Sequence, residues 1–116
     1  MCGICGTVTV SGLADTEGAT LRVQAMLRGE LPYPPIGRTM SFLLVEVDAG
    51  RAVFQGTPKF DHYNPLGSVH GGWALTLIDS AAGCAGHSLL PAGSGYTTVV
   101  LQAHSHHPFS LPGCWQ

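Results

Sequence analysis

The strongest pattern of apolar and polar positions in the chain lies between His70 and Leu90. Small or apolar residues recur there with the spacing of one helix face: Ala74, Leu77, Ile78, Ala81, Ala82 and Ala85. This spacing predicts a long helix that ends before the Pro and Gly residues of 91–95. Because most of these residues are alanines, the helix can lie close against another backbone, as it would if a curved sheet wrapped around it.

Other segments favour strands. The segment 39–48, TMSFLLVEVD, is rich in β-formers, and Asp48-Ala49-Gly50 has turn chemistry. In the segment 51–57, RAVFQGT, Ala52 and Phe54 alternate with Val53 and Gln55, which is typical of a strand. Two antiparallel strands joined by a tight turn are therefore expected. A third strand is predicted at 96–103, YTTVVLQA, and a short amphipathic helix at 19–29.

The remaining segments lack a period. Residues 1–18 are Gly-rich and are expected to be weakly ordered, and residues 31–37, LPYPPIG, are read as a connector because three prolines exclude regular structure. Residues 58–69 form a loop whose polar side chains are free to serve a site, and residues 104–116 form an irregular tail. The length of 116 residues points to a single α+β domain, 1–116.

Charge narrows the choice of partner. The chain carries five Lys and Arg against seven Asp and Glu, for a net charge of −2, so it offers no basic surface for nucleic acid or for an anionic membrane. We therefore expect no nucleic acid and no membrane partner, but a small molecule or another protein. No apolar run could span a bilayer and no secretory signal is present, so a cytoplasmic location is expected.

The cysteines favour neither disulfides nor metal. Cys2 and Cys5 are separated by two residues, and with no secretory signal a disulfide framework is not expected. A zinc site would need Cys114 and the His-x-His-His cluster at 104–107, whose spacing does not match the usual ligand pairs, so we expect no metal.

Asp79 is the first candidate for chemistry. It is the only Asp, Glu, Lys or Arg in the 55 residues that follow Asp61. By helical geometry it lies off the Ala/Leu face, so it need not enter the core. Beside a cleft it could act as a general base or attack an acyl carbon; the alternative is an exposed acid that only aids solubility.

The start of the predicted helix is the second candidate. A helix N-terminus presents unpaired N–H groups, and Gly71 and Gly72 would let a substrate oxygen approach the backbone, as in an oxyanion hole. The alternative is that Ser68 is only an N-cap and that His70 bonds to the preceding loop. His70 and Asp79 are nine residues apart, about 13.5 Å and half a turn, so only a two-fold dimer could bring both to one reacting atom.

Taken together, these residues carry a family resemblance. The segment 62–83, HYNPLGSVHGGWALTLIDSAAG, resembles the central segment of hotdog-fold acyl-CoA thioesterases of the PaaI type, with an Asn in the loop, His-Gly-Gly at the helix start and an Asp nine residues after the His. The flanking segments are similar too, so the resemblance runs from Leu21 to Leu101. It implies a long central helix wrapped by an antiparallel sheet, assembled as a homodimer or homotetramer.

The resemblance also implies a mechanism: hydrolysis of an acyl-CoA or aryl-CoA. Asp79 would be the catalytic carboxylate, the Gly71 N–H would polarise the thioester carbonyl, and Asn64 and His70 would place substrate or water. Thr97 or Thr98 would position a water, and Gly72 would face the substrate. Coenzyme A would lie along the subunit interface as part of the substrate, with no separate cofactor. Trp73 and Tyr96 could line an aromatic acyl pocket or belong to the core.

Two observations qualify this expectation. Family members continue with further strands after Leu101, whereas this chain ends in HSHHPFSLPGCWQ, so we expect the C-terminal strands to be missing through truncation or a frame change. The rival function is then an inactive hotdog module that binds acyl-CoA or only dimerises. Separately, MCGICG resembles the start of class II glutamine amidotransferases, in which Cys2 would be the nucleophile, but the rest of that domain has no counterpart here.

Overall fold

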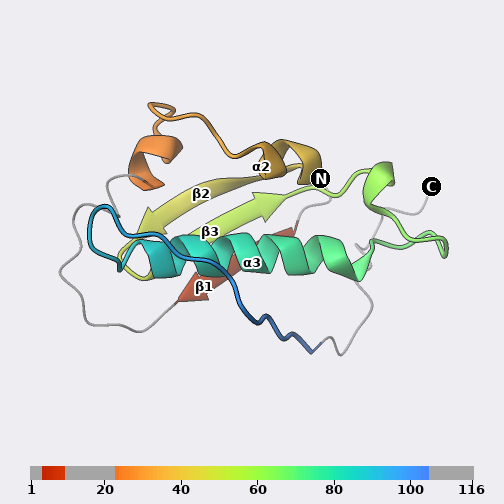
Figure 1. Ribbon diagram of the computed structural model, residues 1–116. Helices are drawn as coiled ribbons and strands as arrows, with labels where there is room; N and C mark the ends of the chain where they lie inside the picture. The colour runs from red at the N-terminus through yellow and green to blue at the C-terminus, as the bar shows by residue number, and fades with distance from the viewer. Residues whose placement is uncertain (1–3, 10–22, 105–116) are drawn as a thin grey trace.

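A 17-residue helix, α3 (Gly71–His87), lies against a three-stranded antiparallel sheet in the computed structural model (Figure 1). The strands are β1 (Ile4–Thr9), β2 (Phe42–Asp48) and β3 (Arg51–Gly56), in the order β1-β3-β2. The structure describes residues 4–9 and 23–104, so Cys2, Cys114 and the tail beyond His104 lie outside the described residues. The predicted α+β class is confirmed.

A bulge in β2 sets which of its residues face the helix. Leu44 is opposite Phe54, but Glu46 is opposite Val53 and Val47 opposite Ala52, so one extra residue sits in β2 between them. The bulge reverses the alternation. Val47 therefore packs against the core, whereas Glu46 points outward and pairs with Arg51 at 2.7 Å.

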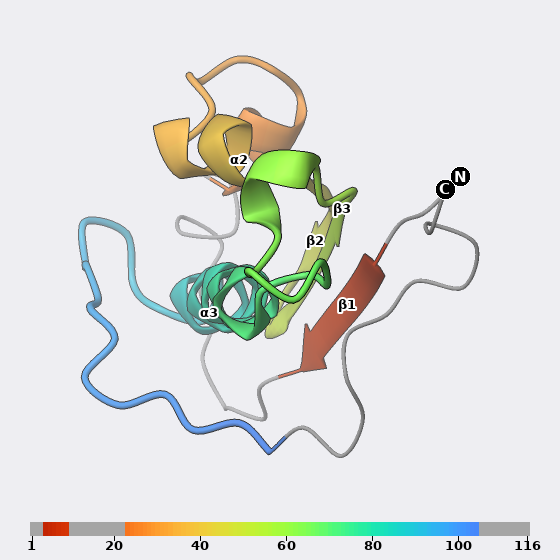
Figure 2. The same cartoon turned by 90° about the vertical axis from the view of Figure 1, so that its right-hand side faces the viewer.

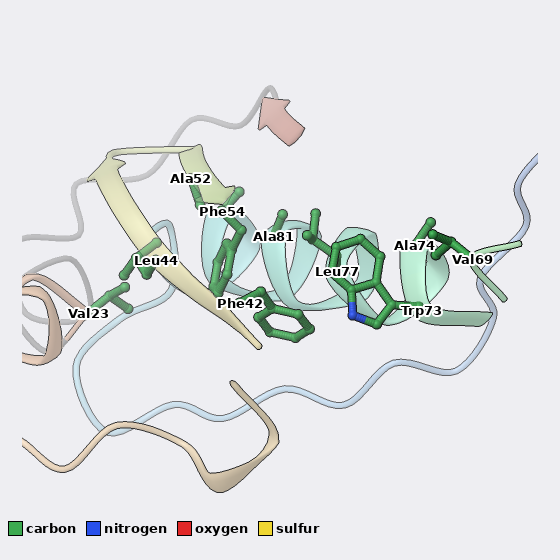
Figure 3. Packing of buried hydrophobic residues seen from close by; sticks show 11 residues of the cluster. Val23, Phe42, Leu44, Ala52, Phe54, Val69, Trp73, Ala74, Leu77 and Ala81 are labelled. Atoms are coloured by element: carbon green, nitrogen blue, oxygen red, sulfur yellow. The ribbon is translucent and has the colours of Figure 1, made fainter. Parts of the chain in front are cut away.

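The core lies between the sheet and α3 (Figure 3). The predicted helix face supplies four of its buried residues: Ala74, Leu77, Ala81 and Ala85. Opposite them, the rings of Phe42 and Phe54 meet edge to face, with centroids 5.9 Å apart. The small helix residues let α3 approach the strands, as the alanine-rich pattern indicates.

Close packing at both ends of the β2–β3 hairpin holds the sheet in place. The Oγ of Ser88, fully buried after α3, accepts the Gly50 N–H at 2.8 Å and so ties the helix end to the β2–β3 turn. At the other end of the hairpin, Gly56 leaves no room for a side chain, because a Cβ there would lie 2.6 Å from the Cβ of Phe42.

The prediction for the Pro-rich segment was wrong. Residues 31–37 were expected to lack regular structure and 39–48 to be strand, but Pro35–Met40 form the helix α2. Pro35 occupies the start of this helix, where no N–H is needed, so a proline favours the helix there. The chain leaves α2 through Ser41 at φ 55°, and β2 begins only at Phe42. Upstream, residues 23–27 are helical, within the range predicted for the first helix.

The third predicted strand was also wrong. Residues 96–103 form no strand in the structure, although their β-branched composition favours one. They cross α3 on the side away from β2 and β3 (Figures 1 and 2), and a strand needs a sheet edge to pair with. The third strand is instead β1, within a Gly-rich stretch whose pattern predicted no element.

Candidate active site

Asp79 lies on α3 and is partly exposed. Its Oδ1 accepts a hydrogen bond from the Thr98 Oγ1–H at 2.7 Å, so the segment after α3 crosses the helix at this carboxylate. Among the described residues Asp79 has no second hydrogen-bond partner, which leaves Oδ2 open to water or substrate. Both predicted threonines are exposed, and of the two only Thr98 makes this contact.

A cavity of about 260 Å³ opens beside Asp79. It lies between the segment 26–36, the strands β2 and β3, and α3. Its lining is mostly apolar: Met26, Tyr33, Pro34, Ile36, Phe42, Leu44, Phe54, Asp79, Ser80, Cys84 and Tyr96. The contribution of 26–36 could not be predicted, because the Pro-rich pattern at 31–37 indicated only a connector.

Tyr96 forms one wall of this cavity although it is 52% exposed. Its ring rests on α3 at Gly83, where a Cβ would lie 2.7 Å from the Tyr96 Cζ. Its other neighbour is the His87 ring, with centroids 5.4 Å apart. Burial, with smaller effects from Cys84 and Asp79, raises the pKa of Tyr96, so its hydroxyl stays protonated near neutral pH.

The start of α3 presents free backbone donors. His70 is the N-cap residue and its side chain makes no cap hydrogen bond, so the alternative in which Ser68 is only the N-cap does not hold. The His70 N–H bonds to the His62 carbonyl at 2.9 Å, which anchors the helix start to the loop. Within the described part of the chain, the N–H groups of Gly71 and Gly72 have no partner, as expected for the first helical turn.

Asn64 shapes the loop that leads to this helix start. Its Oδ1 accepts the N–H groups of Leu66 at 2.9 Å and Ser68 at 3.1 Å, and its Nδ2 donates to the Ser68 Oγ at 2.8 Å. A bridge between Tyr63 and Val69 closes the same loop. The side chain of Asn64 is thereby committed to the loop and positions the helix start within this chain. The His70 side chain is exposed and lies over Gly72.

Trp73 is a core residue. It is 1% exposed, and its Nε1–H donates to the Met40 carbonyl at 2.7 Å. It does not line the cavity, so the expectation that it contacts substrate is corrected: the residue that follows Gly72 turns toward the strands, where its large apolar ring is buried.

Asp79 and the Gly71 N–H lie eight residues apart on the one helix α3. At 1.5 Å per residue this separation is about 12 Å, too far for both groups to reach one thioester within a chain. The expectation that a second subunit completes the site therefore stays a prediction.

The cavity also contains a free thiol, Cys84. Burial raises the pKa of this thiol to about 11. At pH 8 the thiolate fraction is then roughly 0.001, against roughly 0.1 for a thiol with the ordinary pKa of 9.0, and only the thiolate is nucleophilic.

We therefore expect iodoacetamide to modify Cys84 about 100-fold more slowly at pH 8 than it modifies a cysteine in an unstructured peptide. The rate should rise with pH until about 11, because deprotonation is shifted upward. Peptide mass spectrometry after timed alkylation would measure it. Rapid alkylation of Cys84 at pH 8 would contradict this assignment.

In the described ranges, 4–9 and 23–104, no cluster of His, Cys, Asp and Glu could hold a metal ion. None of the helices in these ranges combines the length and the apolar character that spanning a bilayer requires.

Comparison with known proteins bears on one part of the chain. No curated protein and no solved structure gives a match. The family model of the thioesterase superfamily matches residues 66–112, which include all of α3, Asp79 and the segment that carries Thr98. With an antiparallel sheet packed on a long helix, this match supports a partial hotdog fold and thioester hydrolysis as the general chemistry.

Proposed function

We propose that this protein hydrolyses an acyl-CoA or aryl-CoA thioester, as PaaI-type hotdog thioesterases do. The observation that carries the proposal is the position of Asp79: a carboxylate held by Thr98, with one oxygen open, at the wall of an apolar cavity. The match to the thioesterase superfamily supports the reaction class.

In the proposed reaction Asp79 acts as a general base or as a nucleophile. As a base, it takes a proton from a water whose oxygen bonds to the thioester carbonyl carbon. The tetrahedral oxyanion then collapses, the C–S bond breaks, and the departing sulfur takes the proton from Asp79 to give free coenzyme A. As a nucleophile, Asp79 would expel the thiolate and form an anhydride that water hydrolyses.

The oxyanion needs hydrogen-bond donors that Asp79 cannot supply. The unpaired N–H groups of Gly71 and Gly72, at the positive end of the α3 dipole, are suited to this role. Because they lie far from Asp79 on the same helix, we propose that they act on the substrate held by Asp79 of the other subunit of a two-fold dimer. Asn64 would fix the loop before them and His70 would contact substrate or water.

The chain offers a clean test of the backbone donor. Gly71→Pro removes the N–H at the first helical position, where proline fits a helix, and His70 already has the extended conformation (φ −63°, ψ 129°) that a following proline requires. Loss of one oxyanion donor should lower kcat about 10²–10³-fold. Thiol release from octanoyl-CoA and benzoyl-CoA, followed with a thiol-reactive dye, measures it.

Gly71→Ala is the matched control, since it keeps the N–H and a Cβ at this position meets nothing within 4 Å. Equal activities for Gly71→Pro and Gly71→Ala would exclude the Gly71 N–H from catalysis. If the wild-type chain released no thiol from either ester, the enzyme proposal would fail and the rival, an acyl-CoA-binding or dimerisation module, would stand.

A further inference from the structure

The cavity beside Asp79 has a size that matches one part of a thioester. Its volume of about 260 Å³ is below the roughly 300–1,000 Å³ typical of pockets for drug-sized ligands. A whole acyl-CoA therefore cannot enter. A single acyl group can, with its carbonyl at Asp79 and its chain directed between α3 and the segment 26–36.

The chemistry of the lining selects among acyl groups. Across residues 4–9 and 23–104, no Lys, Arg or His lines the cavity, and its one carboxylate is Asp79. The other polar groups of the lining are neutral: the hydroxyls of Tyr33, Ser80 and Tyr96 and the Cys84 thiol, whose pKa is raised by burial. A carboxylate at the far end of an acyl chain would thus enter the cavity without a cation to pair with and near the like charge of Asp79, which is unfavourable.

Tyr96 is held against α3 at one wall of the cavity. Its ring can rest on α3 only because residue 83 is glycine: a Cβ there would lie 2.7 Å and 2.8 Å from the Tyr96 Cζ and Cε2. Tyr96 comes from a segment with no strand to hold it, so its contacts with Gly83 and His87 keep it at the cavity.

We propose that this cavity is an acyl pocket that accepts uncharged apolar acyl groups, excludes those that end in a carboxylate, and is limited in length by Tyr96. The inference rests on the proposed thioesterase function, because that function places the carbonyl at Asp79. To that function the inference adds a substrate class, uncharged apolar acyl groups, and a residue that determines specificity, Tyr96.

The first test measures binding without hydrolysis. The probes are hexanamide and adipamate, which have the same chain length and an amide in place of the thioester but differ in a terminal carboxylate. The protein is labelled with ¹³C at the methionine methyls. Met26 lines the cavity, whereas Met40 packs against the same core without lining the cavity and serves as the internal control. We expect hexanamide to shift the Met26 signal and not that of Met40, with adipamate at least about tenfold weaker.

The second test measures length selection. Tyr96→Ala should raise kcat/KM for decanoyl-CoA relative to hexanoyl-CoA by at least about tenfold, the order expected when a pocket gains room for a few methylenes. Val99→Ala is the control on the same segment, since Val99 is 87% exposed and away from the cavity.

The outcomes separate the two proposals. An absent Met26 shift with both amides, equal binding of hexanamide and adipamate, or an unchanged chain-length ratio in Tyr96→Ala would overturn the acyl pocket even if the wild type hydrolyses thioesters. Conversely, a Met26 shift with hexanamide in a protein that releases no thiol would leave an apolar acyl-binding pocket and remove the proposed hydrolysis.

Discussion

Replacing Asp79 by asparagine should lower the kcat of thiol release by about 10²–10⁴-fold, the range that a positioned general base contributes. Asparagine keeps the size of the side chain and can still accept the Thr98 hydroxyl hydrogen bond made at 2.7 Å, so the segment after α3 should stay in place. It can neither take a proton from water nor attack an acyl carbon. The loss should therefore fall on kcat, with little change in KM.

Asp61→Asn is the matched control, because Asp61 is an exposed carboxylate in the short 3₁₀ helix Phe60–His62 and does not line the cavity. It makes the same chemical change and should leave kcat within about twofold, as expected for a surface substitution. Stopped-flow or plate-based thiol detection on the two variants and the wild type gives the comparison. If Asp79→Asn retained wild-type kcat, Asp79 would be only a surface acid anchoring Thr98.

The parts of this fold that follow a local period could be predicted from the sequence. The Ala/Leu spacing predicted α3, and Ala74, Leu77, Ala81 and Ala85 are all buried. Turn chemistry at 48–50 predicted the β2–β3 hairpin, which the structure contains. A count of charges along the chain was enough to single out Asp79, and helical geometry placed it off the buried face.

The parts that depend on tertiary partners could not be predicted. Whether 96–103 becomes a strand depends on an available sheet edge, and the position beside β3 is taken by β1, whose pattern gave no signal. Likewise, the cavity exists because α2 and residues 26–36 fold over β2 and α3, and no local pattern encodes that long-range packing. The catalytic candidate Asp79 could therefore be predicted from the sequence, but the cavity beside it could not.

The position of Trp73 also depends on tertiary packing that no local pattern encodes. Its substitution should have the largest effect on stability. From the sequence Trp73 could line an acyl pocket or belong to the core; the structure buries it to 1% exposure beside Leu77 (Figure 3). Trp73→Ala should lower the free energy of unfolding by about 3–5 kcal/mol, from lost apolar burial and the cavity left behind. Urea unfolding followed by far-UV circular dichroism would measure it.

Trp73→Phe separates a core role from a substrate role. Phenylalanine keeps most of the ring's burial but removes the Nε1–H that bonds to the Met40 carbonyl at 2.7 Å, and an unpaired buried acceptor costs about 1–3 kcal/mol. This variant should therefore unfold at lower urea yet keep the wild-type KM for octanoyl-CoA, since the ring does not line the acyl cavity. An unchanged unfolding free energy with a KM raised tenfold or more would place Trp73 at the substrate instead, and would mean that the end of α3 nearest the oxyanion donors binds the acyl group.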